Sequence, residues 1–160
     1  MKTLNTLKRA AGFTLIELMI AMAIVAILVR IAYPSYIEHL DRAKRAEGKT
    51  ALLKAAQLQE RNYVASAPST YVDTAGLAAL FRSGYGGPIY SGEDPTSNRG
   101  YYVITAVAGA SGDLRQDFVL TATPNGAANY SDSKCGNLTL TSSGVQGNNG
   151  TLTVSDCWRR

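Results

Sequence analysis

Residues 13–65 carry two hydrophobic patterns in succession. Phe13 to Val29 is an almost unbroken apolar run that contains one charge, Glu17. At about 1.5 Å per residue, a helix over residues 13–32 is long enough to cross a hydrocarbon core of about 30 Å, so the first pattern predicts a membrane span. In the second pattern, apolar positions recur at three- and four-residue intervals or their multiples, which predicts an amphipathic helix. These positions are Tyr36, Ile37, Leu40, Ala43, Ala46, Leu53 and Ala56.

The two patterns join into one predicted helix. Between Pro34 and Pro68 the only strong helix breaker is Gly48, so we expect a continuous helix from Phe13 to about Ala65. Pro34 removes a backbone hydrogen bond and should kink this helix. The charged residues at 38–49, among them Arg42, Lys44 and Arg45, are interpreted as a solvated face rather than as a binding patch.

The composition changes in the second half of the chain, where twelve of the fifteen glycines lie from Gly84 onward. Residues 68–99 predict a connecting segment with a short helical turn around Leu77 to Phe81. Runs rich in β-forming residues then predict four short antiparallel strands. A sheet needs an apolar cover on one face, and the C-terminal half of the helix is the candidate. The expected fold is therefore α+β, a long N-terminal helix packed on a four-stranded antiparallel sheet. The four predicted strands are Tyr101 to Val107, Phe118 to Thr123, Leu138 to Thr141 and Leu152 to Val154.

Glu17 needs a partner, because an ionised acid within a membrane helix costs about 2.5–3.5 kcal/mol on insertion scales. Residues 1–12 carry only basic charges, so the positive-inside rule keeps them in the cytoplasm and exports the chain after the span. A cut after Gly12 would leave Phe13 with a free α-amino group on the same helix face as Glu17. The amine of one subunit could then neutralise the carboxylate of its neighbour. The alternative is a tolerated charge near the membrane surface.

The segment Gly12-Phe13-Thr14-Leu15-Ile16-Glu17 resembles the processing signal of type IV prepilins, the precursors of bacterial pilus fibres. The resemblance implies that a prepilin peptidase cuts after Gly12 and N-methylates Phe13, and that Glu17 guides each subunit into the fibre. Pro34 at this distance from the cut is a further pilin feature. The expected parts are a cleaved leader (1–12), a transmembrane and assembly helix (13–34) and an exported globular domain (35–160).

Motifs near the C-terminus resemble the PilE and ComP group of minor pilins. This resemblance implies a single-pass protein of the bacterial inner membrane that moves into a pilus fibre on the cell surface. The implied partners are other pilin subunits, the prepilin peptidase and the inner-membrane assembly machinery. The motifs are Phe118-Val-Leu-Thr-Ala-Thr-Pro124, Cys135-Gly-Asn-Leu-Thr-Leu140 and Asp156-Cys157-Trp158.

The charge balance, the two cysteines and the single histidine limit the kinds of binding and catalysis that the sequence suggests. The net charge of +4 includes three leader cations, so the mature chain has 13 basic and 12 acidic side chains and does not suggest a strongly basic nucleic-acid binder. Cys135 and Cys157 lie in the exported part, where oxidation is permitted, and predict a disulfide. The single histidine, His39, and the lack of a phosphate loop or zinc motif argue against an enzyme, a cofactor or a metal site.

The favoured function is therefore a structural one, a minor pilin needed for pilus assembly, adhesion and twitching motility. DNA binding during natural transformation is a less favoured alternative, in which Lys134, Arg159 and Arg160 would form the contact if the disulfide joins their flanks. A type II secretion pseudopilin is a second alternative. Such proteins often hold calcium, but Asp113 and Asp117 alone do not supply the six to eight oxygen ligands that calcium takes.

Overall fold

The computed structural model describes residues 13–159, which begin with one long helix. Helix α1 spans Leu15–Ala65 and passes through Pro34, which confirms the predicted continuous helix. It contains a stretch long and apolar enough to cross a membrane, and its large apolar side chains up to Ile31 are exposed. The kink at Pro34 stays a prediction. The chain divides into two compact units between His39 and Leu40.

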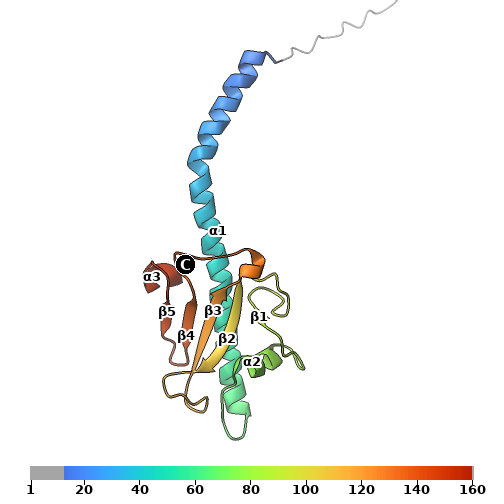
Figure 1. Ribbon diagram of the computed structural model, residues 1–160, viewed down its shortest axis with the longest axis vertical. Helices are drawn as coiled ribbons and strands as arrows, with labels where there is room; N and C mark the ends of the chain where they lie inside the picture. Colours follow the sequence, from blue (N-terminus) through green and yellow to red (C-terminus); the bar gives the residue numbers. More distant parts are fainter. Residues whose placement is uncertain (1–12, 160) are drawn as a thin grey trace, which may run out of the picture. The chain divides into compact units, whose positions relative to one another are not determined.

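The second unit, called here the head domain, contains a five-stranded antiparallel sheet with the strand order β1-β2-β3-β4-β5 (Figure 1). The two long central strands pair from Tyr102 opposite Pro124 to Ala108 opposite Phe118. Three short helical elements precede, connect or follow the strands. They are α2 (Thr74–Phe81), the 3-10 turn η1 (Gly126–Ala128) and α3 (Val154–Trp158). The strands are β1 (Ile89–Tyr90), β2 (Tyr102–Ala108), β3 (Phe118–Pro124), β4 (Leu138–Thr141) and β5 (Gln146–Asn148).

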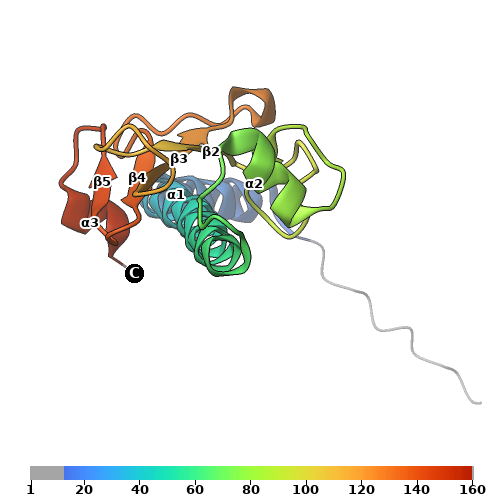
Figure 2. The same ribbon diagram turned by 90° about the horizontal axis from the view of Figure 1, so that it is seen from below.

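The core of the head domain lies between the sheet and the C-terminal half of α1, which runs along one face of the sheet (Figure 2). Successive side chains of a strand point to opposite faces, so alternate residues of the central strands are buried. Helix α1 contributes Leu52 and Ala55, both fully buried, to the same core. Buried strand residues include Tyr102, Ile104, Ala106, Phe118, Leu120, Ala122, Leu138 and Leu140.

The prediction of four strands is wrong in two respects. Strands β1 and β5 were missed, because β1 has only two residues and β5 contains Gln, Gly and Asn rather than β-forming residues. The predicted strand Leu152 to Val154 does not form, because Val154 begins helix α3. The Thr153 side chain caps this helix by accepting a hydrogen bond from the backbone N–H of Asp156 at 3.2 Å. The other three predicted strands are confirmed, with ends that differ by at most one residue.

The buried face of α1 also differs from the predicted stripe. Ala46 and Leu53 are exposed, whereas Gly48, Ala51 and Leu52 are buried. Small residues such as Gly48 and Ala51 are needed at this face of the helix because the sheet comes close to it. A Cβ atom on Gly48 would lie 2.7 Å from Cδ2 of Tyr102, so the helix breaker of the sequence marks a close approach.

Candidate functional site at the C-terminal disulfide

The C-terminal end of the head domain is fastened by the predicted disulfide. Cys135 and Cys157 are bonded with an S–S distance of 2.07 Å and a Cα–Cα distance of 5.7 Å, across 22 residues of chain. Both cysteines are buried. Close by, the backbone N–H of Leu152 donates to the carbonyl oxygen of Lys134 at 2.9 Å. The segments before Cys135 and around Cys157 are therefore held side by side.

Three cationic residues belong to, or contact, the segments that this disulfide joins. Lys134 precedes Cys135 and Arg159 follows Cys157 by two residues, and both are exposed. Lys49 of α1 reaches the same place, because its Nζ donates to the carbonyl oxygens of Arg159 at 3.0 Å and Trp158 at 3.4 Å. Burial, and then the nearby positive charge of Arg45, lower the pKa of the Lys49 amine. We call Lys49, Lys134 and Arg159 the cationic cluster.

The sequence predicted two of the three residues of the cationic cluster, Lys134 and Arg159. The disulfide does join the flanks of Lys134 and Arg159, whereas Arg160 lies outside the described residues. The sequence does not single out Lys49, because it lies among the charged residues that were interpreted as a solvated face. Its spacing of four residues from Arg45, which places the two on one helix face, was the available signal.

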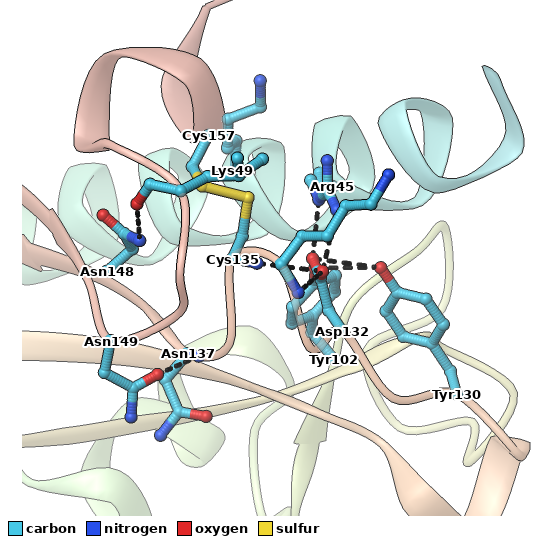
Figure 3. A network of polar contacts seen from close by, with 12 residues as sticks. Arg45, Lys49, Tyr102, Tyr130, Asp132, Cys135, Asn137, Asn148, Asn149 and Cys157 are labelled. Atoms are coloured by element: carbon cyan, nitrogen blue, oxygen red, sulfur yellow. Dashed lines mark hydrogen bonds and ion pairs between the residues drawn. A yellow bond between two sulfur atoms is a disulfide. The ribbon is translucent and has the colours of Figure 1, made fainter. Parts of the chain in front are cut away.

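A buried ion pair connects α1 to the segment that leads into the disulfide (Figure 3). Arg45 donates from Nε to Oδ2 of Asp132 at 2.6 Å and from Nη2 to Oδ1 at 2.8 Å. The two side chains are only 7% and 2% exposed. The hydroxyls of Tyr102 and Tyr130 donate to Oδ2 at 3.3 and 3.4 Å. The expected solvated face is thus wrong for Arg45, which is buried because it has this partner.

The electrostatics of the pair follow from its contacts. Burial by itself would raise the pKa of the Asp132 carboxyl, but hydrogen bonds from Arg45 and the Cys135 amide outweigh it and hold the pKa below its usual value. The hydrogen bond to Asp132 raises the pKa of the Arg45 guanidinium. Burial raises the pKa of Tyr130 to about 12. Both members of the pair are therefore charged at neutral pH, and both tyrosines are neutral donors.

The aromatic residues near the cluster are engaged in packing. The ring of Tyr130 lies edge-on to Tyr101 and Tyr102, with centroid distances of 5.6 and 5.5 Å. Lys44 Nζ lies 4.7 Å from the centroid of the Tyr130 ring. Trp158 donates from Nε1 to the carbonyl oxygen of Gly147 at 3.0 Å. These contacts indicate packing within the domain rather than the open aromatic faces on which bases stack.

The structure describes only some of the remaining predicted site residues. Gly12 and the rest of the leader are outside the described residues, and Glu17 is exposed in the first turn of α1, where its N–H donates to Thr14 Oγ1 at 3.3 Å. Asp117 binds Ser111 within the loop between β2 and β3. Within residues 13–159, no group of three or more His, Cys, Asp or Glu side chains could hold a metal ion.

A long helix with an exposed apolar segment, followed by an antiparallel sheet and a C-terminal disulfide, defines a type IV pilin. The chain belongs to the family described as "Type IV minor pilin ComP, DNA uptake sequence receptor", whose model matches residues 34–139. A second model, the prokaryotic N-terminal methylation motif, matches residues 7–33.

Curated relatives match over shorter segments. The major pilin PilA of Myxococcus xanthus is 54% identical over 44 residues, which are 28% of this chain and 20% of PilA. The major pilin PilE1 of Neisseria gonorrhoeae is 52% identical over 44 residues, which are 28% of this chain and 26% of PilE1. The major fimbrial protein FimA of Dichelobacter nodosus is 54% identical over 37 residues, 23% of each protein. The matched segment thus spans only about a fifth to a quarter of each relative.

Loss of the disulfide should destabilise the head domain. Cys135→Ser should lower the free energy of unfolding by about 2–5 kcal/mol, as for native bridges of small secreted domains. Denaturant unfolding of the purified protein measures this loss, and Cys135→Ser with Cys157→Ser should lose a similar amount because the same bridge is gone. Two reactive thiols in the native, exported protein would contradict the prediction.

Proposed function

We propose that this chain is a minor subunit of a type IV pilus whose head domain binds DNA through the cationic cluster. The observation that carries the proposal is the match of a DNA-receptor pilin family over residues 34–139, which include most of the head domain. The match ends four residues after Cys135, so it includes Lys49 and Lys134.

The N-terminal part of the chain would supply the assembly function. Cleavage after Gly12 and methylation at Phe13 would give a mature subunit anchored in the inner membrane by its apolar helix. Glu17 would then pair with the α-amino group of a neighbouring subunit as the assembly machinery moves the helix into the fibre. The methylation-motif match over residues 7–33 supports this role.

The cationic cluster offers the chemistry for a DNA backbone. The head domain has a nearly balanced overall charge, so steering by net charge contributes little and contacts have to be local. Lys49, Lys134 and Arg159 come from three segments that the disulfide and the Lys49 hydrogen bonds hold together. Cations on segments that are held together in this way can neutralise neighbouring phosphates and release their counterions.

The second candidate is a subunit that contributes to assembly, adhesion and twitching motility without contacting DNA. It is favoured by the curated relatives, which are described as major pilins or fimbrial proteins.

A salt titration distinguishes the two functions. The full mature chain in detergent should bind duplex DNA with an affinity that falls steeply as salt rises. Changing the three cluster residues Lys49, Lys134 and Arg159 together to Gln should remove most of this binding. The slope of log affinity against log salt should become shallower by about 0.9 for each phosphate that the variant no longer neutralises.

The matched control changes three exposed arginines elsewhere in the head domain, Arg61, Arg82 and Arg115, to Gln. It removes the same charge and should keep most of the binding. Equal weakening in both triple variants would show that the cluster does not bind the DNA. A wild-type chain that does not bind DNA even at low salt would favour the purely structural role.

A further inference from the structure

The two carboxylate oxygens of Asp132 have different partners. Oδ2 accepts from Arg45 Nε and from the hydroxyls of Tyr102 and Tyr130. Oδ1 accepts from Arg45 Nη2, and also from the backbone amides of Lys134 at 3.2 Å and Cys135 at 3.0 Å. One side chain therefore joins the helix to the backbone of the loop that carries a cation of the cluster.

These contacts fix the course of the backbone at Lys134. Its N–H is bound to the Asp132 side chain, its carbonyl accepts from Leu152, and the following residue is held by the disulfide. The backbone N–H of Gly136 also donates to the carbonyl oxygen of Asp132 at 2.7 Å, and this hydrogen bond closes the turn. The Lys134 side chain, in contrast, is exposed.

We propose that Asp132 is a positioning residue for DNA binding: its Oδ1 holds the turn of residues 132–135 so that Lys134 is presented beside Lys49 and Arg159. This inference rests on the proposed DNA-binding function. It assigns to Asp132 a task separate from its ion pair with Arg45. An ion pair needs a carboxylate, whereas an amide acceptor needs only an oxygen at the Oδ1 position.

Two double variants separate these tasks. Arg45→Met with Asp132→Asn, and Arg45→Met with Asp132→Leu, both remove the ion pair. Neither leaves an uncompensated buried charge, which is the main cost of breaking such a pair. The Asn side chain keeps an oxygen for the two amides, and the Leu side chain of similar size has none. Leu also removes the polar partner of the Tyr102 and Tyr130 hydroxyls, so the effect that passes through Lys134 is isolated in a Lys134→Ala background. If the Leu variant does not fold, Ala at position 132 takes its place.

Both variants are tested as full mature chains in detergent against duplex DNA, after near-ultraviolet circular dichroism and thiol titration have shown an intact fold and disulfide. The Asn variant should bind within about twofold of wild type, a difference well below the 1.4 kcal/mol of a tenfold change. The Leu variant should bind several-fold more weakly, with a salt slope smaller by about one.

In a Lys134→Ala background the two variants should bind equally, because the effect passes through Lys134. Equal binding with Lys134 present, or a difference that persists without it, would overturn the positioning role.

Amide hydrogen exchange keeps this test independent of DNA. The Lys134 and Cys135 amides should exchange more slowly in the Asn variant than in the Leu variant. Equal exchange would overturn the positioning role even if DNA binds. A different outcome is also possible: the Asn and Leu variants show the expected exchange difference, but the wild-type chain does not bind DNA. That result would overturn the DNA-binding function, and with it the role of this turn in presenting Lys134 to DNA.

Discussion

Glu17→Ala should leave the chain in the membrane and remove most of it from the pilus. Insertion should be at least as favourable as in wild type, because the cost of about 2.5–3.5 kcal/mol for an intramembrane acid is gone. Incorporation should fail because the α-amino group of the neighbouring subunit loses its partner. The ratio of this chain in sheared pili to this chain in the membrane fraction, measured by quantitative immunoblotting, reports the effect.

Two further variants make this result specific. Glu17→Gln keeps the shape and polarity but not the charge, so it should fail like the alanine variant. Glu38→Ala removes an acid of the same helix outside the apolar run and should incorporate normally. Wild-type incorporation of Glu17→Ala would show that this carboxylate does not guide assembly.

Arg45→Ala should lower the free energy of unfolding of the head domain by about 3–5 kcal/mol, because it leaves the Asp132 carboxylate buried without its charge partner. Denaturant unfolding measures this loss. Arg61→Ala, at an exposed position of the same helix, is the control and should change stability by less than about 0.5 kcal/mol. Equal effects at the two positions would mean that the buried pair contributes nothing beyond a surface residue.

The same pair gives the stability a definite pH dependence. The pKa of Asp132 is lower in the folded than in the unfolded chain, so its contribution is fully present above the ordinary carboxyl value and is lost as the pH falls through the folded value. Between about pH 4 and about pH 2, wild type should therefore lose more stability than Arg45→Met with Asp132→Leu, which lacks the carboxyl. Parallel curves for the two proteins would contradict this assignment.

The sequence predicted those parts of the fold whose signals are local. The long helix followed from its apolar run and the spacing after it, and three strands followed from their β-forming residues. Strand β5 could not be found this way, because Gln146 to Asn148 pair with β4 without β-forming side chains. The β-forming residues Leu152 to Val154 predict a strand, although Thr153 and Asp156 have the spacing of a helix cap.

The candidate site was less predictable because its contacts are distant in sequence. Arg45 and Asp132 are 87 residues apart, and nothing near either residue indicates that one will neutralise the other. Lys134 and Arg159 were accessible because the two cysteines predict that their flanks meet. Lys49 was not, since its approach to the C-terminus depends on how the helix lies on the sheet.

The measurement that tests the central claim most directly is the mass of this chain in purified, sheared pili. A processed pilus subunit should be present in the fibres with N-methylated Phe13 as its first residue, and Gly12→Val should block this processing because the side chain obstructs approach to the backbone at the cut. Fibres that contain the chain with Met1 at its N-terminus, or fibres that lack the chain altogether while the membrane holds it, would contradict the account.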